Sequence, residues 1–430
     1  MRKLFLKMPK ILMLTIMIIG SQQVIASNNP DLQTMLDGVL ASQDAESGSV
    51  TGIPLTFQCN GVNNNQPITI ASGKLSNEPN SQNLPIDAIY QIGSDSKSFT
   101  AVVALQLEYE GLFGIKGLDS TVGEMLGNDV YPKWKDLKLR QLLNMTSGIP
   151  EYDNVEIIAQ TYADDPTHFF DTDDLLKSVA NNKLDFTPGT NYKYSNTGYV
   201  LMNKIITQRS GISYKQQVTD RIISKLGLTN TYYIEDIPEN AIPDEKKWQT
   251  SLLMSGYYIE GPDTITYHTK YLYPGVDIKT YSLSITNAPG AIISNSADLN
   301  TYLRALFTVD APNALLTKPE LEELTTFVAQ SDSSKYKAGQ IINGDVDKDT
   351  PMAYGLGISE AYFELPSGQG IVMYAHEGGT YGFYSMWEYQ KNGDVSFTYS
   401  TNSNSILSAK TIFNIHTQLL DTITNYCSIK

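Results

Sequence analysis

The chain has 430 residues, of which 41% are hydrophobic and 18% are charged, so it can bury a large core and is not a disordered chain. At roughly 100–200 residues per domain, this length indicates about two to four structural units. Its 31 basic and 46 acidic residues give a net charge of −15, which argues against binding to nucleic acid or to an anionic membrane surface. Four histidines and two cysteines argue against a multi-histidine metal centre or a zinc ribbon.

The first 26 residues, 1–26, are expected to be a cleaved export signal. Their basic residues are Arg2, Lys3, Lys7 and Lys10. The apolar run 11–20 is too short to span a bilayer comfortably, and Val24–Ala26 fits a small-residue cleavage site before Ser27. A membrane anchor that is kept is the alternative. No later stretch stays apolar for about 18 residues, so the mature protein is predicted to be periplasmic or secreted, without a stable membrane anchor.

Hydrophobic periodicity predicts helices and strands along the rest of the chain. The first part is predicted to contain a helix at 30–43, strands near 53–59 and 66–72, and a helix at 94–110. The middle part is predicted to contain helices at 172–180, 196–209 and 214–226, followed by an irregular segment at 235–285. The last part is predicted to contain helices at 296–307 and 319–327, strands at 370–375, 382–389 and 395–399, and a final helix at 406–426.

Strands near both ends of the chain with helices between them predict an α+β fold. We expect an antiparallel β-sheet, built from residues 27–114 and 286–430 and flanked by N- and C-terminal helices. The pair Asn392-Gly393 is a strong hairpin signal within it. An all-helical domain, residues 115–285, is expected between the two parts, with an irregular insertion near 235–285. A site is expected in the groove between these units.

The two cysteines lie far apart in the sequence. Cys59 ends a strand-like run and Cys427 ends the last predicted helix. An exported protein can keep a disulfide, and this one would tie the two ends of the chain together across a very long loop. Two unrelated buried thiols are the alternative.

A Ser-x-x-Lys pattern opens the predicted helix 94–110. Lys97 would lie one turn after Ser94 on the same face, and a helix N-terminus offers free N–H groups to a developing oxyanion. Lysine is a base only when neutral; its ordinary pKa of about 10.4 leaves roughly one in 2,500 neutral at pH 7, so the site must lower it. The pattern recurs at Ser334–Lys337 in a polar segment, and an N-cap serine is the alternative for Ser94.

A Tyr-x-Asn pattern lies at Tyr194–Asn196. A tyrosine beside a lysine can move a proton between nucleophile and leaving group, and an asparagine amide can hold a substrate carbonyl and the lysine at once. The pattern recurs at Tyr152–Asn154. The alternatives are a solvated loop aromatic for Tyr194 and a helix N-cap for Asn196.

A His-Glu-Gly-Gly segment, His376–Gly379, ends a strand-like run. Paired glycines allow a substrate backbone to approach closely, and an extended substrate can add to a strand edge. The segment is not a zincin motif, because no second histidine stands at the required spacing. A turn between strands with a solvated histidine is the alternative.

Together and in this order, the three motifs resemble those of the serine β-lactamase and D-Ala-D-Ala peptidase superfamily. The resemblance covers nearly all of the mature chain. It is closest to class C β-lactamases and their DD-carboxypeptidase and esterase relatives, in particular the exported Streptomyces-type DD-peptidase whose third motif begins with His. Further family-like stretches are Leu142–Gly148, Ala288–Ser294 and Tyr354–Gly357.

The resemblance implies a role for each motif residue. The implied catalytic residues are Ser94 as nucleophile, Lys97 as its proton acceptor and Tyr194 as general acid and base. The implied substrate-binding residues are Asn196, His376, which stands where many members have Lys, and Gly378. The implied oxyanion hole consists of the backbone N–H groups of Ser94 and Gly379. The reaction would be acylation of the serine and hydrolysis of the acyl-enzyme, with no metal or organic cofactor.

The third motif departs from the carboxypeptidase pattern. Those relatives recognise a terminal carboxylate with hydroxyls in and beside this motif and a nearby Arg, whereas here Glu377 and Gly379 occupy the hydroxyl positions. Ser359-Glu360 follows the Tyr354–Gly357 stretch, and no arginine follows Arg304. A substrate carboxylate about 5 Å from Glu377 would meet a repulsion of roughly 3 kcal/mol at an effective dielectric constant near 20.

Three functions therefore remain open for a small-molecule or peptide substrate. The first is a DD-peptidase or carboxypeptidase-like serine hydrolase of D-amino-acid peptides, with β-lactam binding. The second is an esterase or amidase that uses the same residues. The third is a binder of β-lactams or peptidoglycan fragments that does not turn them over.

Overall fold

The computed structural model describes residues 30–42, 50–234, 252–258, 269–366, 368–392, 395–403 and 409–428. The predicted export signal, 1–26, lies outside these residues, as do parts of the predicted insertion 235–285 and Gly393 of the hairpin signal. No helix in the described part of the chain is both long and apolar enough to span a membrane.

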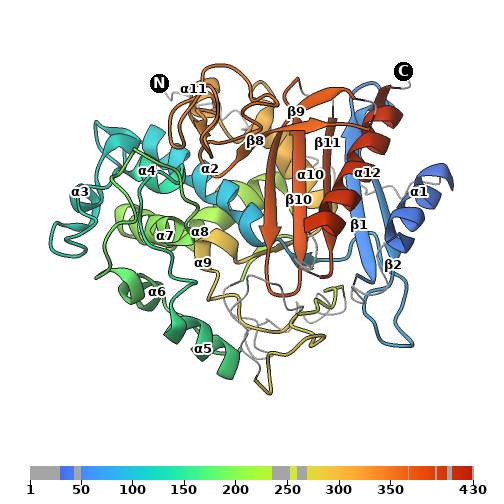
Figure 1. Ribbon diagram of the computed structural model, residues 1–430, viewed down its shortest axis with the longest axis horizontal. Helices are drawn as coiled ribbons and strands as arrows, with labels where there is room; N and C mark the ends of the chain where they lie inside the picture. The colour runs from blue at the N-terminus through green and yellow to red at the C-terminus, as the bar shows by residue number, and fades with distance from the viewer. Residues whose placement is uncertain are drawn as a thin grey trace, which may run out of the picture.

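An antiparallel sheet of eight strands forms one side of the molecule (Figure 1). The strands, in spatial order, are β2 (Ile68–Gly73), β1 (Gly52–Cys59), β11 (Val395–Thr401), β10 (Tyr384–Gln390), β9 (Gly370–Gly379), β8 (Ser359–Glu364), β7 (Met352–Tyr354) and β6 (Val328–Ala329). β1 pairs with β11, so that Phe57 lies opposite Phe397 and the two ends of the chain meet within the sheet. This confirms the predicted α+β fold.

The first and last helices, α1 (Pro30–Ala41) and α12 (Ala409–Ser428), cover one face of this sheet. Alternate strand residues point to this face, as strand geometry requires. They form an apolar core with the helices: Leu36 of α1, Leu55 and Phe57 of β1, and Leu419 and Ile423 of α12 are fully buried. The core therefore joins the two chain ends.

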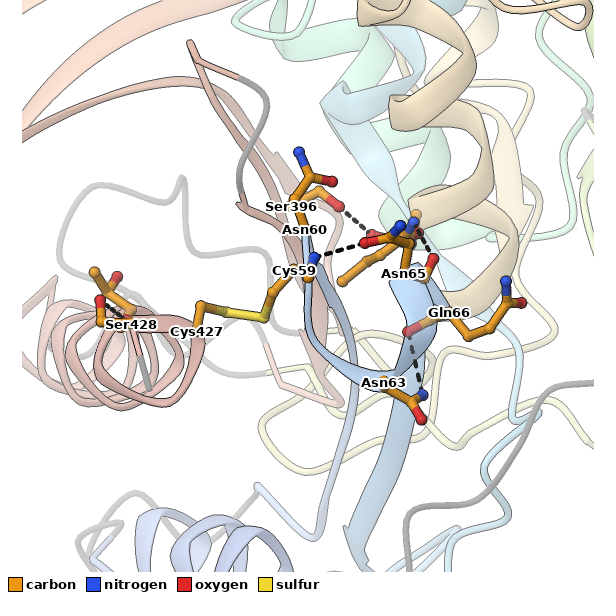
Figure 2. The surroundings of a disulfide bond; sticks show 12 residues. Cys59, Asn60, Asn63, Asn65, Gln66, Ser396, Cys427 and Ser428 are labelled. Carbon is orange, nitrogen blue, oxygen red and sulfur yellow. Dashed lines mark hydrogen bonds between the residues drawn. A yellow bond between two sulfur atoms is a disulfide. The ribbon is translucent and has the colours of Figure 1, made fainter. Parts of the chain in front are cut away.

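A disulfide adds a covalent link to this core. Cys59 at the end of β1 and Cys427 near the end of α12 are bonded, with their Cα atoms 5.6 Å apart (Figure 2). The bond closes a sequence separation of 368 residues. The structure therefore contains the predicted disulfide, and the alternative of two unrelated buried thiols is wrong.

The opposite face of the sheet carries a polar layer under α10 (Ser296–Phe307). The hydroxyl oxygen of Thr56 on β1 lies 2.9 Å from that of Thr69 on β2 and 2.8 Å from that of Ser296. Thr398 of β11 donates to the backbone carbonyl of Ser296 at 2.7 Å. These buried hydroxyls are hydrogen-bonded to each other or to the backbone, so their burial carries no uncompensated cost.

The other side of the molecule is helical (Figure 1). Its helices are α2 (Ser96–Tyr109), α3 (Val122–Leu126), α4 (Leu139–Leu143), α5 (Glu156–Asp164), α6 (Thr172–Val179), α7 (Asn196–Ser210), α8 (Tyr214–Val218), α9 (Asn287–Gly290) and α11 (Lys318–Leu324). A small sheet with the order β3 (Tyr90–Gln91), β5 (Ile292–Ser294) and β4 (Tyr232–Tyr233) lies beside them. α2 is buried along most of its length and packs on α10, where Phe99 stacks on Tyr302.

Most predicted elements form within a few residues of their expected bounds. The hairpin signal is confirmed, because β10 and β11 pair as neighbours. The helix expected at 214–226 changes to π-helical geometry over Thr219–Ser224, and the short strands β3 to β8 were not foreseen. The described parts of 235–285, which are 252–258 and 269–285, contain no helix or strand. The boundaries at 115 and 285 remain predictions.

Candidate active site

The nucleophile candidate lies in a tight turn between the small sheet and α2. Ser94 occupies a 3₁₀ turn, Gly93–Asp95, and Lys97 follows in the first turn of α2. The Nζ atom of Lys97 donates to Ser94 Oγ at 2.8 Å and to the carbonyl of Pro289 at 3.3 Å. Ser94 is therefore not the N-cap of α2, and its hydroxyl faces the amine.

Lys97 is fully buried, which changes its protonation. Burial lowers the pKa of Lys97 to about 7, while the carboxylates of Glu151, Asp153 and Asp95 act in the opposite direction. Desolvation disfavours the charged amine, so roughly half of it is neutral at pH 7. A neutral amine in hydrogen-bond contact with a serine hydroxyl can accept its proton.

Tyr194 lies on the other side of this pair. The Nζ atom of Lys97 is 4.7 Å from the centre of the Tyr194 ring. Burial raises the pKa of Tyr194 well above its ordinary value, and a hydrogen bond with Ser94 opposes that effect only in part. The phenol therefore keeps its proton at neutral pH and can donate it. The structure thus brings Ser94, Lys97 and Tyr194 together.

Asn196 begins α7 and is bound by two acidic residues. Its side-chain Nδ2 donates to Asp153 Oδ2 at 2.7 Å, and its backbone N–H donates to Glu151 Oε2 at 2.5 Å. The N-cap of α7 is Ser195, so the N-cap interpretation of Asn196 is wrong. Burial, followed by the charge of Asp153, raises the pKa of Glu151 to about 8.

The two acidic residues were missed at the level of sequence. Glu151 and Asp153 lie in Pro150–Asp153, shortly after the family-like stretch Leu142–Gly148. This closeness to a family-like stretch was the only sequence signal for their part in the site. Both carboxylates raise the pKa of Lys97 against the effect of burial. They therefore help to set how much of the amine is neutral.

The paired glycines of the third motif serve a close contact within the protein. A Cβ atom on Gly378 would lie 1.8 Å from the carbonyl oxygen of Ile92, and one on Gly93 would lie 2.7 Å from the backbone nitrogen of Gly379. The turn that carries Ser94 thus packs directly on β9. We expected Gly378 to make room for a substrate backbone; this role stays a prediction. This contact brings the backbone of Gly379 to the Ser94 turn, as the implied oxyanion hole requires.

His376 is buried on β9, so the solvated-turn interpretation is wrong. Its Nε2 lies 2.9 Å from the hydroxyl of Tyr354 and its Nδ1 lies 2.7 Å from the carbonyl oxygen of Glu377. Burial, and then the charge of Lys97, lowers the pKa of His376 to about 3, so the ring is neutral at neutral pH. A carbonyl oxygen can only accept, so Nδ1 carries the hydrogen and Nε2 accepts from Tyr354. Both ring nitrogens are thus engaged by the protein.

Asp95, beside the nucleophile, connects the Ser94 turn to the sheet. The hydroxyl of Ser385 on β10 lies 2.6 Å from Asp95 Oδ2 and 2.8 Å from the carbonyl oxygen of Ile92. Burial raises the pKa of Asp95 well above its ordinary value. The Ser385 hydroxyl donates to Asp95 Oδ2 or to the Ile92 carbonyl, and so links β10 to both ends of the Ser94 turn. Nothing in the sequence motifs pointed to Ser385.

A pocket of about 870 Å³ opens beside Ser94. Besides Ser94, Tyr194 and His376, its lining includes Tyr192, Gln330, Met352, Tyr354, Ser359, Tyr362, Glu377, Gly379 and Tyr384. Glu360 is not in the lining; it is buried on β8, where it accepts from Lys391 Nζ at 3.1 Å and from the backbone N–H of Val346 at 3.0 Å. Glu377 is exposed and faces the pocket.

The second Ser-x-x-Lys copy, Ser334–Lys337, lies in a polar loop and does not line this pocket. Lys335 pairs with Asp347, and Lys337 pairs with Asp332 at 2.8 Å. Both lysines are partners in surface ion pairs, so this copy does not form a second site.

An antiparallel sheet joined to a helical region, with a serine, a lysine and a tyrosine where they meet, is the arrangement of the serine β-lactamase and transpeptidase class. A model of the Beta-lactamase family matches residues 61–411. The chain belongs to this family.

Curated relatives match over only part of their length. Penicillin-binding protein 4* of Bacillus subtilis is 31% identical over 151 residues, which is 34% of this chain and 31% of the relative. Protein flp of Staphylococcus aureus is 20% identical over 321 residues, which is 73% of this chain and 57% of the relative. The chain thus spans about a third to somewhat more than half of these relatives.

Solved structures match over most of the chain. A D-stereospecific amidohydrolase from Streptomyces is similar with a TM-score of 0.65 and 25% identity, covering 89% of this chain and 96% of that one. D-amino acid amidase from Ochrobactrum anthropi SV3 is similar with a TM-score of 0.71 and 21% identity, covering 92% of this chain and 99% of that one. The second of these similarities shows the shared fold alone.

Proposed function

We propose that this protein is a serine amidohydrolase that forms an acyl-enzyme at Ser94. The observation that carries the proposal is the hydrogen bond of 2.8 Å between Ser94 Oγ and a buried Lys97 whose pKa is lowered to about 7. A hydroxyl, a partly neutral amine and a protonated phenol in mutual contact are what nucleophilic acyl transfer needs.

The proposed reaction has two stages. Ser94 Oγ bonds to the carbonyl carbon of the substrate while its proton passes to Lys97, and the N–H groups of Ser94 and Gly379 stabilise the oxyanion. Tyr194 gives its proton to the leaving nitrogen as the carbon–nitrogen bond breaks, and recovers one from Lys97. Water then attacks the acyl-enzyme, with the same groups accepting its proton, and releases the acid and the free serine. This scheme uses no metal or organic cofactor.

The substrates we propose are amides and peptides that contain D-amino acids. The name of one structural neighbour, a D-stereospecific amidohydrolase that is 25% identical, supports this class. Among such substrates, neutral amides fit better than peptides with a free terminal carboxylate, because Glu377 faces the pocket and the described lining contains no lysine or arginine. Strict D-Ala-D-Ala carboxypeptidase activity is therefore expected to be weak.

We also propose that the protein is exported. The disulfide between Cys59 and Cys427 supports an oxidising location, since such bonds persist in the periplasm or outside the cell and are rare in the cytosol.

The test is acylation and turnover by the purified mature protein. Labelled penicillin and a panel of D-amino-acid amides, D-Ala-D-Ala peptides and p-nitrophenyl esters are offered to the protein and to Ser94→Ala. Amide hydrolysis that is lost in Ser94→Ala supports the proposal. Ester turnover without amide hydrolysis would instead make it an esterase, and stable acylation without turnover would make it a binder. Turnover that persists in Ser94→Ala would refute the acyl-enzyme.

A further inference from the structure

The pocket beside Ser94 carries one formal charge among its described lining residues. Glu377 is the only acidic side chain there, and no lysine or arginine is present. The two histidines of the lining are buried, which lowers the pKa of His376 to about 3 and that of His416 to about 4, so both are neutral near pH 7. The electrostatic character of the pocket is therefore set by one carboxylate.

That carboxylate is placed to reach a ligand. Glu377 is exposed on β9, two residues before the implied oxyanion donor Gly379. Its Oε2 accepts a hydrogen bond from Tyr384 at 3.2 Å, and it takes part in none of the ion pairs found among the described residues. Its charge contributes to the raised pKa of Asp95 beside the nucleophile and of Tyr192 in the wall of the pocket. The field of Glu377 thus extends across the pocket.

The walls around it are largely aromatic. Tyr192, Tyr354, Tyr362, Phe363 and Tyr384 all line the pocket. Aromatic faces attract cations through the ring quadrupole, and a carboxylate adds a direct charge interaction. Apart from the oxyanion hole at Ser94 and Gly379, an anionic group would find no lysine or arginine in the described lining. Carboxylate and aromatic rings together are the chemistry that recognises an ammonium group.

We propose that this pocket selects substrates that carry a positive charge in the part lying against Glu377. The inference rests on the function proposed above and names its substrate class: amides or esters with an ammonium group close to the scissile bond. The net charge of −15 acts in the same direction, since it raises the local concentration of cationic substrates. The cation can lie on the acyl side or on the leaving-group side, and the experiment separates the two.

The experiment uses two pairs of esters that differ in charge and not in shape. For the leaving-group side, 3-(trimethylammonio)phenyl acetate is compared with 3-tert-butylphenyl acetate. For the acyl side, the phenyl ester of trimethylammonioacetic acid is compared with that of 3,3-dimethylbutanoic acid. In each pair the preference is the ratio of kcat/KM for the cation to kcat/KM for its neutral isostere. Dividing the wild-type preference by that of Glu377→Gln cancels the intrinsic reactivity of the esters.

The wild-type preference is expected to exceed that of Glu377→Gln by about tenfold or more in one of the two pairs, which then identifies the side of the cation. Glu377→Lys is expected to reverse the preference and to favour 3-acetoxybenzoate over 3-tert-butylphenyl acetate. The matched control is Glu364→Gln, which removes the same formal charge from an exposed position on β8 outside the pocket and should leave both preferences unchanged.

Two failures are distinguishable. If the preferences in both pairs are the same in wild type and Glu377→Gln while Ser94→Ala abolishes hydrolysis of the neutral esters, the charge selection is wrong and the proposed function stands. If hydrolysis persists in Ser94→Ala, the proposed function itself is wrong. Thermal unfolding of each variant shows that it is folded, and since a preference is a ratio within one variant, a change in the active fraction does not alter it.

Discussion

The two faces of the large sheet have different roles in the protein. On the face covered by α1 and α12, alternate residues of the strands form an apolar core joined by a disulfide, with one buried ionisable pair, Glu388 and His416. On the face toward α2, the protein buries the ionisable groups of Asp95, Lys97 and His376 completely or nearly so. Burial disfavours the charged form of each group, and it therefore shifts the pKa values of Asp95, Lys97 and His376 around Ser94. The first face provides stability and the second maintains a reactive site.

Replacing the buried amine should separate these two roles most clearly. Lys97→Met keeps much of the side-chain volume but removes the proton acceptor, so kcat/KM for amide substrates is expected to fall about 10²–10⁴-fold. The free energy of unfolding at pH 8 should rise, because the variant no longer has to deprotonate a lysine on folding. Steady-state kinetics and urea unfolding measure the two effects. Lys215→Met, at an exposed position on α8, is the control; a Lys97→Met variant with normal kinetics would contradict the assigned role.

Removing the disulfide should lower the stability and leave the activity nearly unchanged. Cys59→Ser with Cys427→Ser is expected to lower the free energy of unfolding by about 2–5 kcal/mol, because the bond closes a very long loop. The kcat/KM value of the folded protein should change by less than about twofold, since the bond lies on the face away from Ser94. Urea unfolding and kinetics at low denaturant test this. A large loss of activity without loss of stability would mean that the two faces are coupled.

A single methyl group on β9 should disturb the site through the backbone. In Gly378→Ala the new Cβ would lie 1.8 Å from the carbonyl oxygen of Ile92, so the Ser94 turn must shift. A misplaced nucleophile is expected to lower kcat/KM about 10²-fold. The matched control is Gly38→Ala in α1, where a Cβ meets no atom within 4 Å and a helical alanine should stabilise the protein slightly. Equal kinetics in the two variants would rule out this contact.

The pH dependence of the reaction should report the protonation of the Lys97 amine. Burial lowers the pKa of Lys97 to about 7, so the amine gains a proton as the pH falls and stops acting as a base. The value of kcat/KM for a neutral ester is expected to fall about tenfold per pH unit below pH 7 and to be flat above it. For stability, the unfolded lysine binds a proton up to about pH 10.4, so the contribution of Lys97 to unfolding free energy increases with pH between about 7 and 10.4. A value of kcat/KM that does not fall as the pH drops below 7 would argue against Lys97 as the base.

Local patterns in the sequence predicted the site well where its geometry is local. Ser94 and Lys97 lie three residues apart, and the rise of one helical turn is enough to bring their side chains together. The strands and helices at the two ends of the chain were also predicted, because their apolar residues repeat with the period of a strand or a helix.

Prediction failed where distant segments meet. The burial of His376 was not foreseen, because its partner Tyr354 comes from another strand and its ring lies near Trp387. Its role in substrate binding stays a prediction. The Ser385 contact with Asp95 joins residues 290 positions apart, and no local pattern encodes it. The short strands β6 and β7 have too few residues to show a period.

The sequence by itself determined the order of the three motifs, the helical turn that presents Lys97 to Ser94, and the α+β arrangement. Only the tertiary structure decided the protonation of these groups, the direction in which Glu377 faces, and the packing of the Ser94 turn on Gly378. The physical reason is that spacing along a helix or strand depends on covalent geometry, whereas desolvation and close contact depend on which remote segments exclude water from a side chain.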